Sequence, residues 1–342
     1  MGHIVKISIL GCGSVSRTHI SRLSALPEGE AEVVGLCDTL RERADDLRRH
    51  VNRFRNLAPE PLGQDAVFSD YGSMLERVKA DAIVICTPHA LHYDNVIKAL
   101  SQGIHVLVEK PMALGSKEAG NMVSKAEEMK RILAVGYQRH CQPEYLHARH
   151  ILLSKKLGDV HFIAAWLAQN LFAAGRWYLD PKFSGGGQIK ASGTHLIDCI
   201  LWMTDSEPVR VKALMDRCGE EVDIYSCLTV ELSNGAIANI AISGGAPGLT
   251  TAVQEEVRVW CSKGALFIMN EGLYIQGPDG DITRLEAGKL PEVSPNIDVN
   301  FIRAIEGKEE CLSPGIWGLR ATKLEEMAYG DAGSPIPSKL KR

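Results

Sequence analysis

The chain has 342 residues, 45% of them hydrophobic, so it is long enough to bury a large core, and two domains are expected. Its 38 basic and 42 acidic side chains give a formal charge of −4, with no run of Lys or Arg to bind phosphate backbones, so nucleic acid is not an expected partner. The first apolar run ends at Gly11, too short for a membrane span and without a cleavage site. We therefore predict a soluble, cytoplasmic protein with no membrane partner.

Short apolar runs alternate with helix-like stretches through the first third of the chain. Strands are predicted near residues 4–10, 32–37, 81–86, 104–108 and 133–136, and helices near 14–26, 41–50, 90–101 and 116–130. Fully apolar strands in such an alternation are typical of a parallel sheet covered on both faces. We therefore predict an α/β, doubly wound domain over residues 1–138.

A glycine-rich loop, "GCGSVSRTH", follows the first predicted strand directly. Gly11 and Gly13 have the G-x-G spacing, and Ser16 stands where a third glycine of the dinucleotide-binding pattern would be. Gly11 permits a tight turn, and Gly13 lets the backbone approach a pyrophosphate at the positive end of the next helix. The loop predicts a Rossmann domain that binds a dinucleotide.

Asp38 ends the second predicted strand in "VVGLCD". Its carboxylate would accept hydrogen bonds from the adenosine ribose hydroxyls and repel a 2′-phosphate, which favours NAD over NADP. Arg41 and Arg43 follow closely, so NADP stays possible, although a solvated helix face is the simpler role for these two arginines.

The pattern changes after a predicted helix at 142–154. From about residue 158, polar and apolar residues alternate, as in "YSCLTVEL" and "GAIANIAIS", which flank an Asn234-Gly235 hairpin signal. Further strands are predicted at 208–216, 254–261 and 264–269, with Gly264 as a turn residue, and the tail at 296–329 is predicted helical with a break near Pro314. Residues 139–342 are thus predicted to form an α+β domain with a large, mostly antiparallel open-faced sheet, for substrate binding and oligomerisation.

Nine cysteines are scattered through apolar segments, with no Cys-x-x-Cys pair and no Cys/His ligand spacing. We predict buried, reduced thiols, including Cys12, although a thiol at a helix N-terminus can have a lowered pKa. His140, His147 and His150 with Glu144 superficially suggest a metal site, but we interpret them as helix-face residues and predict no metal.

The fourth and fifth predicted strands end in "CTPHALH" and "EKP". With the G-x-G loop, the "GYQRH" after the sixth strand, and "GGG" followed eight residues later by His195, this order resembles the Gfo/Idh/MocA family of glucose-fructose oxidoreductases and inositol dehydrogenases over nearly the whole chain. Ligands of open parallel sheets bind beyond the carboxyl ends of the strands, where Glu109 and Lys110 would lie. The resemblance implies that Glu109 touches the nicotinamide ribose and that Lys110 reaches the substrate hydroxyl.

Oxidation of a secondary alcohol needs a base for the hydroxyl proton and a cation beside the oxygen. We predict His195 as the base and Lys110 as the electrostatic stabiliser, with Asp198 either orienting His195 or pairing locally. The residues predicted to bind NAD are Gly11, Gly13, Ser14, Val15, Asp38, Thr87, Pro88, His92, Glu109, Lys110, Gln138 and Trp177. Those predicted to bind a sugar or polyol substrate are Lys110, Tyr137, Arg139, Lys190, Thr194 and His195. Only the resemblance implies that Tyr137, Gln138 and Arg139 face the cleft and that Trp177 lies near the nicotinamide.

The sequence departs from the family pattern at two positions. Ala191 stands where the family has an Asp four residues before the histidine, and Tyr178 stands where many relatives carry an Arg, for which Arg176 could compensate. Lys190 could then be a second cation of the site, or a surface lysine on a loop. His19, in the first predicted helix, is expected to be structural.

Three functions are compatible with these features. The first is an NAD-dependent oxidoreductase acting on a secondary hydroxyl of a sugar, sugar derivative or cyclitol. The second is an NAD-dependent glycosidase, a reaction that the family resemblance also allows. The third is a non-catalytic dinucleotide-binding sensor, motivated by Ala191. The apolar alternation on both sides of Asn234-Gly235 predicts a homo-oligomer, a dimer or tetramer.

Overall fold

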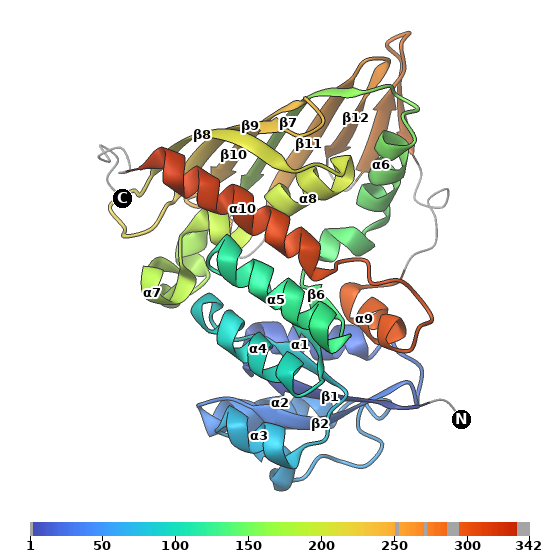
Figure 1. Cartoon of the computed structure of the whole chain (residues 1–342), viewed down its shortest axis with the longest axis vertical. Helices are drawn as coiled ribbons and strands as arrows, with labels where there is room; N and C mark the ends of the chain where they lie inside the picture. Colours follow the sequence, from blue (N-terminus) through green and yellow to red (C-terminus); the bar gives the residue numbers. More distant parts are fainter. Residues whose placement is uncertain (1–2, 250–252, 270–271, 286–293, 334–342) are drawn as a thin grey trace. The chain divides into compact units, whose positions relative to one another are not determined.

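The computed structural model describes residues 3–249, 253–269, 272–285 and 294–333. These residues fall into two compact units (Figure 1). Unit 1 takes the described residues within 1–112, 117–138 and 294–316, and unit 2 takes those within 113–116, 139–293 and 317–342. Among the residues described, no helix is both long and apolar enough to cross a bilayer.

Unit 1 is built on a six-stranded parallel sheet. Its strands are β1 (Val5–Leu10), β2 (Ala31–Cys37), β3 (Val67–Phe68), β4 (Ala82–Ile85), β5 (His105–Val108) and β6 (Leu133–Val135), in the spatial order β3-β2-β1-β4-β5-β6. The order reverses between β1 and β4, which pair in parallel, and the carboxyl edge at such a point is where open α/β sheets bind ligands. The predicted doubly wound fold is confirmed.

Helices cover both faces of this sheet. They are α1 (Ser14–Leu23), α2 (Arg41–Val51), α3 (Tyr71–Arg77), α4 (His92–Ser101), α5 (Ser116–Met129) and α9 (Ile297–Ile305). α1 packs against α2 and α9. Tyr71 of α3 donates a hydrogen bond to the Asn95 carbonyl oxygen of α4, and Tyr93 of α4 accepts one from the Asn121 side-chain amide of α5. Apart from Ser8 of β1, the buried side chains of the strands are apolar, as expected of a sheet covered on both sides.

Unit 2 contains an eight-stranded, mostly antiparallel sheet (Figure 1). The strands are β7 (Val160–Ala168), β8 (Pro208–Asp216), β9 (Tyr225–Leu232), β10 (Ile237–Ser243), β11 (Gln254–Cys261), β12 (Gly264–Met269), β13 (Gly272–Gln276) and β14 (Ile282–Leu285), in the order β14-β13-β12-β11-β7-β10-β9-β8. One pairing, β7 with β10, is parallel. The predicted hairpin is confirmed, since β9 and β10 pair antiparallel and Gly235 has φ +85°.

The helices of unit 2 are α6 (Pro143–Leu153), α7 (Pro181–Ser184), α8 (Thr194–Thr204) and α10 (Gly315–Ala332). α8 packs on β7 and α6 packs on α8, β12 and β13, so the two helices bury one face of the sheet. A five-residue π-helix, η6 (Ile189–Gly193), runs directly into α8. The glycine-rich segment predicted as a loop before a helix therefore ends in a π-turn.

Several predicted elements differ from the structure. The sequence analysis missed β3 and α3, which are short, as well as β13 and β14. Gly264 begins β12 instead of lying in the turn, and a Cβ there would stand 2.4 Å from the Gln276 carbonyl oxygen, so glycine serves the close approach of β13. Residues 294–316, placed by prediction in the second domain, belong to unit 1, because α9 packs on α1 and β5.

Candidate dinucleotide and substrate site

Gly11 and Gly13 shape the loop between β1 and α1 in different ways. Gly11 has φ +87°, and a Cβ there would lie 2.6 Å from the Cys86 carbonyl oxygen, so both conformation and space require glycine. Gly13 is the N-cap of α1 without a side-chain hydrogen bond, and a Cβ there would meet nothing within 4 Å. The N-terminus of α1 thus begins at a residue with open space beside it and no side-chain cap, which fits the pyrophosphate of a dinucleotide.

The next residues support that loop. Ser16, in place of the third glycine, is buried, and its hydroxyl donates to the Gly13 carbonyl oxygen at 2.6 Å. Ser14 and Val15 are exposed at the start of α1. A small side chain at position 16 thus allows the close packing of the helix that the sequence predicted.

Asp38 connects the ends of the first two strands. One carboxylate oxygen accepts from the Cys12 amide at 2.8 Å, and the other accepts from the Leu40 amide at 2.9 Å. Each oxygen keeps lone pairs for further donors, so the half-exposed carboxylate suits the ribose hydroxyls of a dinucleotide. Arg41 donates to the Val67 carbonyl oxygen, and this bond ties its side chain to β3.

Glu109 and Lys110 directly follow β5, at the carboxyl edge of the sheet, and Thr87 and Pro88 follow β4. Glu109 accepts from His19 Nε2 at 3.0 Å, and the other ring nitrogen of His19 lies 2.5 Å from Asp298 in α9. Burial alone would raise the pKa of Glu109, but the hydrogen bond and charge of His19, together with Lys110, lower it to about 2. Glu109 is therefore held ionised and fixed in place.

His19, expected to be structural, lies buried between two carboxylates, one of which is the predicted site residue Glu109. Burial works against its charged form, but the charge of Asp298 outweighs that cost, and the pKa of His19 is raised well above its usual range. The sequence signal that could have indicated the buried contacts of His19 is the presence of an ionisable residue at a buried position of an amphipathic helix. Its two partners, 90 and 279 residues away in sequence, could not be read from a local pattern.

His92 supports the loops at this edge. It is fully buried in α4, and its two ring nitrogens lie 2.8 Å from the carbonyl oxygens of Pro111 and Thr87. Burial lowers its pKa. Both nitrogens lie against the backbone that carries the predicted site, and the one that bears the proton can donate to its carbonyl oxygen. This geometry favours a supporting role over direct contact with a cofactor.

In unit 2, His195 lies in the first turn of α8, half-buried, next to the buried Thr194. Asp198 does not show the predicted alternatives of local pairing or capping, because its carboxylate accepts from His140 Nε2 at 2.9 Å. Burial raises the pKa of Asp198 in spite of that contact. The imidazole of His140 also stacks on Trp202, with ring centroids 4.1 Å apart, so His140 is a buried partner of α8 and not a helix-face residue.

Two other predicted substrate residues, Arg139 and Tyr137, are buried. Arg139 makes a two-point ion pair with Glu255 of β11, which also accepts from the Tyr145 hydroxyl at 2.6 Å. Tyr137 is fully buried at the end of β6, and the half-buried Gln138 follows it. The guanidinium of Arg139 is therefore oriented by a carboxylate that the sequence analysis did not identify.

Lys190 is only 2% exposed, so the alternative of a surface lysine was wrong. Its ammonium lies 2.8 Å from Glu325 of α10 and 3.0 Å from the Leu114 carbonyl oxygen. Ala191 is also buried, in an apolar cluster with Leu171, Cys218, Val222 and Ile224. The family carboxylate is thus replaced by a small apolar side chain in a core environment.

Trp177 stacks on Tyr178, with ring centroids 3.8 Å apart. Trp177 also borders a cavity of about 500 Å³ in unit 2, which is further lined by Arg176, Leu179, Asp180, Lys182, Phe183, Glu220 and Glu221. The mixture of aromatic and charged groups suits a polar ligand better than an apolar one.

The cysteines and histidines give no sign of metal chemistry in the described part of the chain, where no cluster of His, Cys, Asp and Glu could hold an ion. All nine thiols are free. Cys12 is buried, and burial raises its pKa, so it is not an activated thiol. Cys227 is exposed on β9, which corrects the prediction of burial at that position.

The fold and the loop after β1 define a dinucleotide-binding α/β protein, and comparison with known proteins agrees. Residues 5–137 match the model of the oxidoreductase family with the NAD-binding Rossmann fold, and residues 145–267 match the C-terminal domain of the same Gfo/Idh/MocA family. The chain belongs to the Gfo/Idh/MocA family. The predicted family and NAD-binding domain are thereby confirmed.

Individual relatives are distant. A D-glucoside 3-dehydrogenase of Escherichia coli is 25% identical over 58% of this chain and 54% of its own length, so the chain matches about half of that relative. An inositol 2-dehydrogenase of Rhizobium meliloti is 24% identical over 95% of this chain and 96% of its own. An inositol dehydrogenase homologue of Azotobacter vinelandii, solved with NADH and myo-inositol, shares the fold with TM-score 0.79 and 18% identity, covering 96% of both chains.

Proposed function

We propose that the protein is an NAD-dependent oxidoreductase that acts on a secondary hydroxyl of a sugar, sugar derivative or cyclitol. The observation that carries this proposal is the Glu109–Lys110 pair at the carboxyl edge of the NAD-binding sheet, with Glu109 fixed by His19. The named relatives are dehydrogenases of inositol and glucosides, which supports the substrate class.

NAD, when bound, would supply the acceptor or donor of a hydride. Gly11, Gly13 and the first turn of α1 would hold its pyrophosphate, and Asp38 its adenosine ribose. Glu109 would accept a hydrogen bond from the nicotinamide ribose. The other contacts that we propose for the cofactor come from Ser14, Val15, Thr87, Pro88, Gln138 and Trp177.

Lys110 and His195 would act on one substrate hydroxyl. The ammonium of Lys110 would stabilise the negative charge that develops on the oxygen, and the imidazole of His195 would take the hydroxyl proton. Tyr137, Arg139 and Thr194 would contact the remaining hydroxyls. We assign Lys190 to anchoring instead of substrate contact, because Glu325 and the Leu114 carbonyl oxygen occupy its ammonium.

Turnover by two substituted proteins tests these roles. Lys110→Ala should lower kcat with inositol or a glucoside about 100- to 1000-fold, the usual loss for one stabilising group. His195→Gln should lower it roughly 100- to 10,000-fold through lost proton transfer. Lys117→Ala and His161→Gln, at exposed positions, are the matched controls. Near-normal turnover of either active-site variant would overturn its assignment.

A non-catalytic sensor is the second candidate, favoured by the burial of Ala191 among apolar side chains. Such a protein would quench or enhance NADH fluorescence on binding and respond to a sugar, yet produce no NADH from NAD and any alcohol tested. A screen of sugars and cyclitols with NAD therefore separates the two functions, and detectable turnover would eliminate the sensor.

A further inference from the structure

The segment that leads to His195 is held by one buried carboxylate. Asp223, just before β9, accepts from the amide of Gly187 at 2.7 Å and from the amide of Ile189 at 2.9 Å. Its main-chain oxygen accepts from the Gln188 amide at 2.8 Å. Three consecutive N–H groups at the entrance of η6 thus bind a single residue.

The glycines of the "GGG" motif make this contact possible. A Cβ at Gly187 would stand 1.8 Å from the Asp223 carbonyl oxygen, and a Cβ at Gly186 would stand 2.2 Å from the Tyr329 hydroxyl. Any side chain at either position would push the segment off its anchors. The motif therefore serves close backbone approach in this chain.

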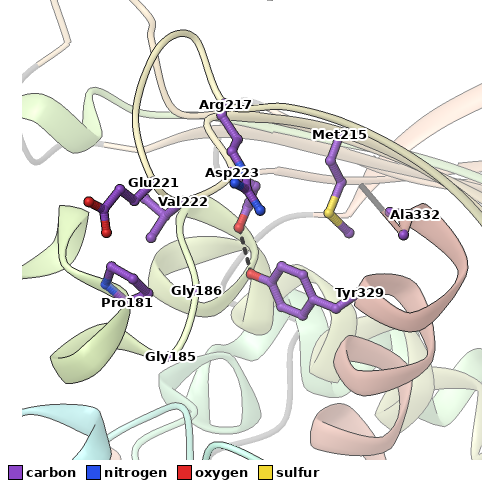
Figure 2. A pocket seen from close by; sticks show the side chains of 11 residues that line it. Pro181, Gly185, Gly186, Met215, Arg217, Glu221, Val222, Asp223, Tyr329 and Ala332 are labelled. Atoms are coloured by element: carbon purple, nitrogen blue, oxygen red, sulfur yellow. Dashed lines mark hydrogen bonds between the residues drawn. The ribbon is translucent and has the colours of Figure 1, made fainter. Parts of the chain in front are cut away.

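Helix α10 supplies two further anchors from one face. Glu325 and Tyr329 are four residues apart, so their side chains lie one above the other. The Tyr329 hydroxyl donates to Asp223 at 2.5 Å, and Figure 2 shows it directed at that carboxylate. Glu325 is fully buried and forms an ion pair with Lys190, a residue of η6.

The donors to the Asp223 carboxylate are two backbone amides and two side-chain hydroxyls. Burial, reinforced by Asp223, raises the pKa of Tyr329 well above its usual range, so the hydroxyl stays a proton donor. The carboxylate of Asp223 accepts four hydrogen bonds from described residues, including one from the Ser226 hydroxyl at 3.3 Å. A buried carboxylate with so many donors fixes the orientation of everything bound to it.

We propose that Asp223, with Tyr329 and the Lys190–Glu325 pair, forms the set of positioning residues that orients His195 through η6. This inference rests on the proposed role of His195. η6 ends at Gly193, two residues before that histidine, and a π-helix is a rare conformation that needs outside support. Ala191 carries no carboxylate, so the carboxylates that contact residues 187–190, those of Asp223 and Glu325, come from other parts of the chain.

A cavity of about 170 Å³ borders the Asp223–Tyr329 pair (Figure 2). Its presence predicts different effects for substitutions of these two residues. In Tyr329→Phe, water from this cavity can reach Asp223 and replace the lost donor, so a mild effect is expected. Asp223→Asn instead presents an amide to backbone N–H groups, and nothing in the cavity can repair that mismatch. Glu221→Gln changes a carboxylate to an amide in the same cavity wall and is the matched control.

The direct test follows the imidazole of His195 by NMR in protein labelled at histidine Cε1, with the resonance assigned from its loss in His195→Gln. We expect the resonance to move clearly in Asp223→Asn, slightly in Tyr329→Phe and not at all in Glu221→Gln. Hydrogen exchange at the amides of residues 187–189 should accelerate in the same order. An unmoved resonance with unchanged exchange in Asp223→Asn would overturn the proposal.

Kinetics separate this proposal from the proposed function. Asp223→Asn should lower kcat about 10- to 100-fold, the size expected when a catalytic group is displaced by about 1 Å. The Kd of NADH should change less than twofold, because the predicted NADH contacts of the loop after β1 lie in unit 1. Normal kcat in Asp223→Asn, with an active parent protein, would overturn the positioning role alone. If the parent protein were inactive but the His195 resonance still moved in Asp223→Asn, the proposed oxidoreductase activity would be overturned and the positioning role of Asp223 would remain supported.

Discussion

His19 Nε2 lies 3.0 Å from Glu109 Oε1, and the opposite ring nitrogen lies 2.5 Å from Asp298, so a buried imidazolium joins the first helix of unit 1 to the predicted catalytic edge. The relationship explains how a carboxylate can stand ionised at the end of a buried strand. A cation behind Glu109 offsets the cost of its desolvation.

Replacement of His19 should therefore destabilise unit 1 in a pH-dependent way. Removing one partner of a buried ion pair costs about 3–5 kcal/mol, so His19→Gln should lower the free energy of unfolding by that order near pH 6. Because the folded pKa of Glu109 is depressed to about 2, its share of the stabilisation is present above its usual value of 4.5 and is lost as pH falls towards 2.

Urea unfolding of the parent protein and His19→Gln between pH 6 and pH 3 measures this difference. The gap between the two proteins should narrow as the solution is acidified. The exposed His161→Gln serves as control, and a gap of constant size would refute the ionic account of the contact.

The two loop glycines should respond oppositely to alanine. Gly11→Ala places a Cβ 2.6 Å from a carbonyl oxygen at φ +87° and should cost about 1–3 kcal/mol of stability. Gly13→Ala has room for the methyl group at φ −80° and should fold normally. It should still weaken NADH binding at least about tenfold, because the methyl group occupies the approach of the pyrophosphate.

Thermal unfolding and NADH fluorescence titration of both variants provide the comparison. If Gly13→Ala bound NADH as tightly as the parent protein, the pyrophosphate would have to lie elsewhere, and the interpretation of the loop would fail.

Asp38 should set the preference between NAD and NADP. Its carboxylate would repel a 2′-phosphate, so the parent protein should bind NAD more tightly, and Asp38→Asn should shift the ratio of the two Kd values towards NADP by about tenfold, equivalent to 1.4 kcal/mol. The amide oxygen can keep one of the two backbone contacts that Asp38 makes. Calorimetric titration with each cofactor, with Glu42→Gln as control, measures the ratio, and a strong NADP preference of the parent protein would contradict the prediction.

The outer face of the sheet in unit 2 should mediate self-association. Leu214 is 64% exposed, and Phe162, Trp166 and Trp260 are about 40% exposed, with Phe162 opposite Trp260 on paired strands. Such a large apolar surface is typical of an interface. Sedimentation velocity should reveal a dimer or tetramer that Trp260→Lys dissociates and that Ile4→Lys, an exposed change in unit 1, leaves intact. A monomeric parent protein would be incompatible with this expectation.

Local sequence patterns were sufficient to predict secondary structure and the conformation of Gly11, because both depend on neighbouring residues. The alternation of apolar strands and amphipathic helices predicted the parallel sheet, because the periods of helices and strands differ. Gly11 was predicted correctly, since a positive φ and a close backbone contact leave no other choice. Three strands of the second sheet were predicted with the observed bounds, 208–216, 254–261 and 264–269.

The partners of charged side chains were beyond the reach of any local pattern. The bond of Asp198 to His140 was not predicted. Lys190 seemed a surface residue but pairs with Glu325, and α9 joins unit 1 although most of unit 2 precedes it in sequence. Each outcome depends on which distant segment packs against the residue. The packing of segments is in turn determined by the burial of the apolar faces of helices and sheets.

The sequence by itself determined the dinucleotide-binding loop and the position of Glu109 and Lys110 after a buried strand, because these follow from backbone geometry and short-range spacing. The family was predicted from the resemblance of its ordered motifs. Only the tertiary structure decided that His19 holds Glu109 and that Asp223 and α10 hold the segment before His195. A buried charge must find its counter-charge wherever the folded chain brings one, and that distance in space bears no relation to distance along the sequence.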